Sequence, residues 1–242
     1  MAGIASRWAG HGLRAILLGL LLCAFAAKAA LPDYQAFYSE GERRLLWVPS
    51  EQGLSEPEHQ AAQQLAKQGT EVWLLDLTHA YFLPQLPSSM DVVPQHDLID
   101  WLRAALADGK GVTLYAVARA TVPVLHAAAR LESAQRARLC VLLMHPNLYA
   151  VAEPLAEPGY LDMGDLSGLR VRLLQPRRSA ATPWLPGQLA HLAMQGAAVS
   201  HVMLENLRET YWARETPTEF EVAESRRMAA MLLREMNAWG CR

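Results

Sequence analysis

Apolar runs of strand length alternate with amphipathic stretches along most of the chain. Seven of these runs have the length and continuous hydrophobicity of buried strands. The predicted strands span residues 35–38, 43–48, 71–77, 111–118, 138–144, 169–174 and 198–205. Longer stretches repeat apolar residues at the helical period, as Ile99, Leu102 and Leu106 do. The predicted helices span residues 55–68, 94–108, 121–136, 186–195 and 216–238.

Turn and capping signals mark the ends of several elements. Residues 39–42 (SEGE) separate the first two strands and predict a hairpin. Ser55 and Glu58 have the spacing of a helix capping box, and residues 216–219 predict a second one. Gly69 and Gly196 follow predicted helices, where glycine favours the left-handed backbone that ends a helix.

Strands that alternate with helices indicate βαβ crossovers and a mainly parallel sheet. The expected fold is therefore α/β, with a doubly wound sheet of about seven strands covered by helices on both faces. No repeat or linker interrupts residues 31–242, which we expect to form a single domain. The stretch 146–168 is the longest irregular segment and is too short for a sizeable lid.

The first 29 residues have the pattern of a Sec-type signal peptide. Arg7 and Arg14 precede an apolar run over residues 15–27, and Ala27-Lys28-Ala29 resembles a cleavage site. The run is short for a membrane span, although a retained anchor is the alternative to cleavage. We expect a mature bacterial protein that begins near Ala30, is periplasmic or secreted, and has no membrane span after leader removal.

Removing this leader changes the charge balance. The first 30 residues hold three bases and no acid, so the remainder carries 24 acids against 19 bases, a formal charge of −5. This balance argues against a nucleic-acid partner. Cys140 and Cys241 remain, without a CxxC motif, and we expect them to be unpaired even though an oxidising compartment permits a disulfide bond.

Three segments in order resemble the α/β-hydrolase fold. LLWVPSEQG resembles a strand that ends in the oxyanion loop, and EVWLLDL resembles the strand that follows. LYAVARATVPVLHAAA resembles the strand, turn and helix that carry the nucleophile in that superfamily. The resemblance implies a serine-hydrolase site at the carboxyl ends of the strands.

The residues that such a site needs are not at the expected positions. Ala118 stands at the nucleophile position, and a shift of one residue would place Arg119 there. The segment that should hold the acid, residues 175–179, has no carboxylate, and residues 205–210 have no histidine. Thr121 is the nearest hydroxyl, and we expect it to cap the following helix. The resemblance is therefore to a member that has lost its catalytic triad.

Ligands of open α/β sheets bind beyond the carboxyl ends of the strands. The polar residues predicted to lie there are Ser50, Glu51, His79, Arg119, His145, Arg177, Arg178 and Arg208. Four arginines at strand ends suit an anion, since guanidinium groups bind carboxylate and phosphate. We therefore expect an anionic small molecule or another periplasmic protein as partner; alternatively, the arginines pair with Asp76, Glu51 or Glu205.

Two enzymatic alternatives remain open. A rearranged esterase or hydrolase site would combine a loop hydroxyl (Ser50, Ser88, Ser89 or Ser179) with His79 or His145 as base. A zinc site would combine His79 and His145 with Asp76 or Glu205, but it lacks a ligand motif, and we expect no metal or other cofactor. The aromatic residues of 81–84, Trp184 and Tyr211-Trp212 are candidates for a pocket or a protein-binding face.

Overall fold

Seven strands form one sheet in the part of the chain that the structure, a computed structural model, describes: residues 31–150 and 158–241. The strands are β1 (Gln35–Phe37), β2 (Arg43–Val48), β3 (Thr70–Leu74), β4 (Gly111–Val117), β5 (Leu139–Met144), β6 (Arg170–Pro176) and β7 (Ala198–Leu204). Their order is β1-β3-β2-β4-β5-β6-β7, and every neighbouring pair is parallel except β1 with β3. The predicted seven-stranded, mainly parallel sheet is confirmed.

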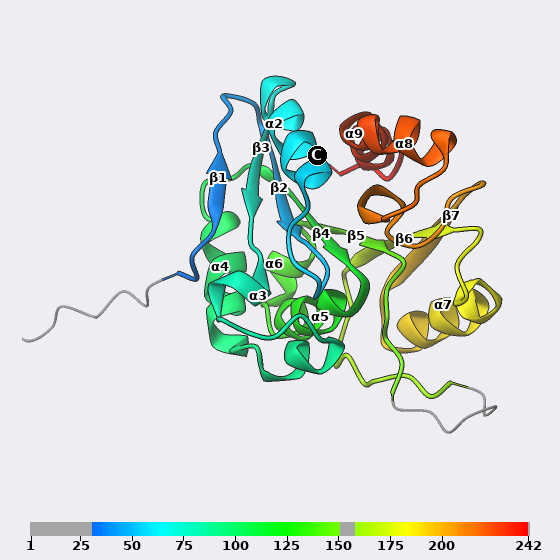
Figure 1. Cartoon of the computed structure of the whole chain (residues 1–242). Helices are drawn as coiled ribbons and strands as arrows, with labels where there is room; N and C mark the ends of the chain where they lie inside the picture. The colour runs from blue at the N-terminus through cyan, green and yellow to red at the C-terminus, as the bar shows by residue number, and fades with distance from the viewer. Residues whose placement is uncertain (1–30, 151–157, 242) are drawn as a thin grey trace, which may run out of the picture. The chain divides into compact units, whose positions relative to one another are not determined.

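Helices cover both faces of this sheet (Figure 1), as a doubly wound fold requires. One face packs α4 (Gln95–Ala105), α5 (Thr121–Ala129) and α7 (Leu185–Met194). The other carries α2 (Glu56–Lys67), α8 (Glu219–Arg226) and α9 (Met228–Ala238). The shorter helices are α3 (Leu77–Ala80), α6 (Ser133–Arg136), and the 3₁₀ turns η1 (Pro87–Val92), η2 (Ala118–Ala120), η3 (Thr182–Trp184) and η4 (Tyr211–Ala213). None of the described helices has the length and hydropathy needed to cross a membrane.

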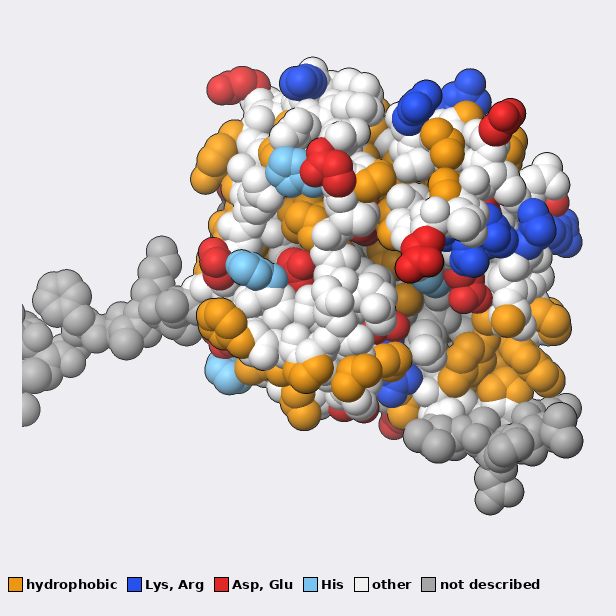
Figure 2. Space-filling model, in the orientation of Figure 1, with side chains coloured by type: hydrophobic (Ala, Val, Ile, Leu, Met, Phe, Trp, Pro, Cys, Tyr) orange, Lys and Arg blue, Asp and Glu red, His pale blue; other side chains and the backbone are white. Residues whose placement is uncertain are grey.

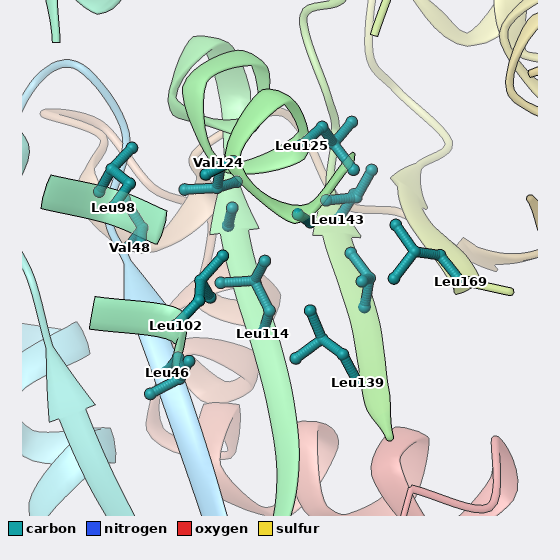
Figure 3. Packing of buried hydrophobic residues seen from close by; sticks show 14 of the residues in the cluster. Leu46, Val48, Leu98, Leu102, Leu114, Val124, Leu125, Leu139, Leu143 and Leu169 are labelled. Carbon is teal, nitrogen blue, oxygen red and sulfur yellow. The ribbon is translucent and has the colours of Figure 1, made fainter. Parts of the chain in front are cut away.

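Alternate strand residues enter two separate hydrophobic cores. Leu46 and Val48 of β2 contact the side of α4 and α5, together with Leu114 of β4 (Figure 3). Leu45 and Trp47 of the same strand point to the opposite face, against α2 and α9. All five side chains are fully buried, and burying each contributes roughly 1.5–3 kcal/mol to folding. Packing in these two cores holds the strands in place, and so positions the loops that follow them.

The signal-peptide prediction concerns residues 1–29, which lie outside the described residues. From residue 31 onward the chain forms one compact unit. The segment predicted to be too short for a lid includes 151–157, also outside the described residues. On either side of that stretch, Ala150 N donates to Gly159 O and Leu161 N donates to Leu148 O, so these two flanks pair with each other.

The predicted hairpin between the first two strands is wrong. β3 lies between β1 and β2, and Gln35 of β1 pairs antiparallel with Leu74 of β3. The connecting turn crosses the beginning of β3 so closely that a Cβ on Gly41 would lie 1.8 Å from the Gly69 carbonyl oxygen. Only glycine fits this crossing. The local sequence signals a turn but does not reveal which strand comes between.

Two long predicted helices are each divided into two. The segment 121–136 contains α5 and α6, and the segment 216–238 contains α8 and α9. The second capping box begins at Thr218, two residues later than predicted. Thr218 is the cap, since its hydroxyl accepts a hydrogen bond from Glu221 N (3.2 Å) while Glu221 Oε2 accepts one from Thr218 N (2.9 Å).

The strand predicted over 71–77 ends earlier, at Leu74. Asp76 turns the chain instead, because its side chain accepts a hydrogen bond from His79 N and begins the short helix α3. Apolar periodicity cannot separate this one-turn helix from the end of a strand.

Cys140 and Cys241 form a disulfide bond, so the expectation that they are unpaired is wrong. Cys140 lies in β5, and Cys241 follows α9, which packs on the same face of the sheet. Their Cα atoms are 5.6 Å apart, within the range that a disulfide spans. Because the two cysteines are 101 residues apart, local sequence patterns do not reveal the pairing.

This disulfide should make a large contribution to stability. Closing a loop of about 100 residues reduces the entropy of the unfolded chain by an amount worth about 4.7 kcal/mol. The double variant Cys140→Ala/Cys241→Ala should lose about 3–5 kcal/mol of unfolding free energy in urea titrations. Dithiothreitol should destabilise the parent protein and leave the variant unchanged. Equal stabilities of parent and variant would contradict this account.

Candidate functional site

The chain makes a strained turn directly after β4. Ala118 has φ 50°, a left-handed conformation that costs an alanine roughly 1–2 kcal/mol. Two hydrogen bonds to its carbonyl oxygen hold the turn, one from Thr121 Oγ1 (2.6 Å) and one from Asn147 N (3.0 Å). Ala118, and not Arg119, therefore occupies the turn at which the resemblance places a nucleophile. Thr121 is the first residue of α5 and bonds back to this turn, so its predicted capping role is wrong.

A carboxylate of the chain itself binds the backbone at this turn. Glu51 Oε2 accepts a hydrogen bond of 3.0 Å from Arg119 N. Glu51 comes from the loop after β2 and is only 8% exposed. In the α/β-hydrolase fold, the amide of the residue after the nucleophile belongs to the oxyanion hole. Here that donor is already bound to a carboxyl group of the chain itself.

A cavity of about 550 Å³ opens above this turn. Its described lining residues come from loops at the carboxyl ends of the strands: Ser50, Glu51, Gln52, Ala118, His145, Pro146, Asn147, Tyr149, Pro158, Ala180, Ala181, Trp184, Glu209 and Thr210. We call it the elbow cavity. Of the five described non-glycine residues with positive φ, three (Ala118, His145 and Thr210) line it. Strained residues of this kind gather at functional sites, where the surrounding structure maintains them.

His145 follows β5 and forms part of the wall of the elbow cavity. It is 8% exposed, and its Nε2 has no hydrogen-bond partner among the described residues. Burial lowers the pKa of the imidazole to about 4, although the nearby Glu209 carboxylate acts in the opposite direction. The imidazole is therefore neutral at pH 7, and the ring also lies against Trp212, with centroids 6.0 Å apart.

Ser179 and Glu209 meet beyond the ends of β6 and β7. The Ser179 hydroxyl donates a hydrogen bond to Glu209 Oε1. These are the two segments in which the resemblance places the acid and the histidine of a triad. A serine and a carboxylate thus stand where a carboxylate and an imidazole are expected.

Only some of the predicted site residues come together. Ser50, Glu51 and His145 line the elbow cavity with Ala118. Arg119 is not among its lining residues and supports the neighbouring loop, with Nη1 2.7 Å from Tyr149 O and Nη2 3.2 Å from Asp91 Oδ1.

The other three arginines also lie outside the lining of this cavity. Arg177 pairs with Glu205 (2.7 Å), as the alternative interpretation expected, and Arg208 donates to Glu221 Oε1 (2.7 Å). The Arg208 guanidinium lowers the pKa of the Glu221 carboxyl to about 2. Arg178 is exposed, without a side-chain partner among the described residues. Basic side chains gather over α8 and the end of β7, at the upper right of Figure 2.

His79 is separated from His145. It lies with Asp76 in a different hollow, of about 380 Å³, near β1 and β3. Within residues 31–150 and 158–241, no three His, Cys, Asp or Glu side chains are grouped closely enough to hold a metal ion. The zinc hypothesis, which needs both histidines in one place, has no geometric support in this part of the chain.

Sequence reasoning missed Glu209 and Tyr149. Glu209 lies in the segment where the resemblance places a catalytic histidine, so the family pattern gives its carboxylate no role. Trp184, expected in a pocket, does line the elbow cavity. Tyr211 and Trp212, expected with it, are largely buried and line a different, smaller cavity of about 250 Å³ between α2 and α8.

Comparison with solved structures shows an α/β-hydrolase-like fold. The hyperthermophilic esterase from the archaeon Pyrobaculum calidifontis has a TM-score of 0.56 at 11% identity, covering 83% of each chain. Esterase Est22 gives 0.59 at 12% identity, covering 82% of this chain and 73% of that one. A dienelactone hydrolase-like promiscuous phosphotriesterase from metagenomic libraries gives 0.53 at 12% identity, with 82% and 88% covered. No protein-family model and no curated protein sequence matches the chain. At these identities the likeness concerns the fold.

The buried imidazole makes stability depend on pH. Between about pH 6.5 and 4, the unfolded chain binds a proton at His145 that the folded chain does not, so the unfolding free energy falls with the pH. His145→Asn removes this group and retains a residue type that tolerates positive φ. On going from pH 7 to pH 4, the parent should lose about 3 kcal/mol more than the variant in urea titrations. If the unfolding free energies of parent and variant change equally between pH 7 and pH 4, His145 does not titrate in this way.

Proposed function

We propose that this is an exported pseudoenzyme with an α/β-hydrolase-like fold, which binds a small molecule or a partner protein in the elbow cavity. The observation that carries the proposal is the Glu51–Arg119 hydrogen bond beside the methyl group of Ala118. A methyl group cannot attack a carbonyl. A substrate oxyanion would compete with a fixed carboxylate for the same amide and would be repelled by its charge.

The cavity itself supports a binding role. Its volume of about 550 Å³ lies within the range of small-molecule sites, roughly 300–1,000 Å³. The expected anionic ligand has little support here, because none of the described lining residues is Lys or Arg. Of the four arginines near the strand ends, only Arg178 has no acidic side-chain partner among the described residues, and it is exposed to an acidic partner on the neighbouring surface.

Export rests on two independent features. Residues 1–29 have the signal-peptide pattern, and the Cys140–Cys241 disulfide suits an oxidising compartment such as a periplasm.

A hydrolase with a rearranged site is the second candidate. The similar folds belong to esterases and other hydrolases, and this favours it. In such a site Ser179 would be the nucleophile and Glu209, which accepts its hydrogen bond, would take the proton. The neutral His145 on the same cavity wall would be available to protonate a leaving group only at the low pH set by its pKa of about 4.

Activity assays separate the two candidates. The purified protein should hydrolyse p-nitrophenyl acetate at the background rate and should not be labelled by a fluorophosphonate probe. Restoring only the hydroxyl, as Ala118→Ser, should leave both readouts unchanged, because Glu51 still occupies the amide that would have to bind the oxyanion.

Stoichiometric labelling of the parent would overturn the binding proposal. Ser179→Ala would then identify the nucleophile, since it should abolish labelling if the rearranged site is catalytic. Ser50→Ala is the matched control, because Ser50 is a cavity serine that has no carboxylate partner in the described part of the chain.

A further inference from the structure

The charged side chains that line the elbow cavity are acidic. Its described lining residues include two carboxylates, Glu51 and Glu209, and no cationic side chain. The one titratable base on its wall, His145, is neutral at pH 7 because burial lowers its pKa. The cavity therefore favours a ligand that carries positive charge.

Both carboxylates keep an oxygen for such a ligand. Glu51 uses Oε2 to accept from Arg119 N, and Glu209 uses Oε1 to accept from Ser179. Neither Glu51 Oε1 nor Glu209 Oε2 has a donor among the described residues. An ammonium group has three N–H donors and no acceptor, which matches what these two carboxylates can still accept.

A buried polar atom in the same wall also lacks a partner. His145 is more than nine-tenths buried, and its Nε2 makes no hydrogen bond to any described residue. The Tyr149 hydroxyl is likewise buried and unpaired. A buried polar group without a hydrogen-bond partner destabilises the folded state. A hydrogen bond from a ligand to such a group is therefore worth more free energy than the same bond to water.

Aromatic side chains supply the rest of the lining. Trp184, which is 41% exposed, and Tyr149 both lie on the cavity wall. Aromatic faces attract organic cations and bury an apolar body. A metal ion fits less well, because the described residues contain no cluster of three metal-ligating side chains.

We propose that the elbow cavity binds a primary amine with an aromatic or apolar body, with the ammonium group held by Glu51 and Glu209 and the body against Trp184 and Tyr149. The proposal rests on the binding function proposed above and replaces the anionic ligand expected from the sequence with a cationic one.

Isothermal titration calorimetry with three ligands of similar shape tests this assignment. At pH 7, 2-phenylethylamine should bind about tenfold or more tightly than 2-phenylethanol, and 3-phenylpropionate should bind most weakly. Glu209→Gln should weaken amine binding about tenfold or more, while retaining the acceptor for Ser179. Glu205→Gln, on the same segment but paired with Arg177 outside the cavity, should leave the affinity unchanged.

Three results would overturn the assignment: no detectable amine binding, equal affinity for amine and alcohol, or an amine affinity that Glu209→Gln does not change. Tighter binding of the alcohol or the acid, lost in Trp184→Ala, would reject the amine and retain the binding function. Hydrolytic turnover or fluorophosphonate labelling would reject the binding function itself. The two proposals therefore fail through different measurements.

Discussion

The arrangement at the strand ends depends on the left-handed turn at Ala118. Because φ is positive there, the chain reverses sharply between β4 and α5 and directs the Arg119 amide toward the loop after β2. Glu51 accepts from that amide, and Asn147 and Thr121 hold the preceding carbonyl. Three segments distant in sequence thus meet at one peptide unit.

In a serine hydrolase this backbone geometry presents a hydroxyl and stabilises the negative charge that develops during the reaction. In this chain the same geometry presents the methyl group of Ala118, and the amide that follows is bound by the side chain of Glu51. The strain costs about the same in both cases, since it belongs to the backbone. Ala118 keeps this unfavourable backbone conformation, and His145 and Thr210 on the same cavity wall also have positive φ.

Much of the fold follows from the sequence, because a parallel strand covered on both faces must be continuously apolar. The runs at β2, β4 and β5 are of this kind and are predicted almost to the residue. The order of β1, β2 and β3 could not be predicted. The sequence of the short turn between β1 and β2 does not show whether these two strands are neighbours or another strand lies between them. The disulfide could not be predicted either, because its two cysteines approach only through the packing of α9.

The site shows a similar division. The methyl group at the turn, and the carboxylate in the loop after β2, could be identified by their position in the chain. The hydrogen bond from the Arg119 amide to that carboxylate could not, because it depends on a backbone angle that an alanine rarely adopts. The anion site expected from the arginines is not supported, since residue type alone does not show that Arg177 and Arg208 already have acidic partners.

The disulfide has a topological consequence for the cavity. Cys140 and Cys241 enclose nearly all of the chain from β5 onward, including the segments that bear His145, Trp184 and Glu209. The residues from 140 to 241 therefore form a covalent ring, to which the half of the chain with Glu51 and Ala118 is attached at β5. A single backbone cut within the ring leaves both pieces joined, so this side of the cavity is protected from loss of a fragment after limited proteolysis.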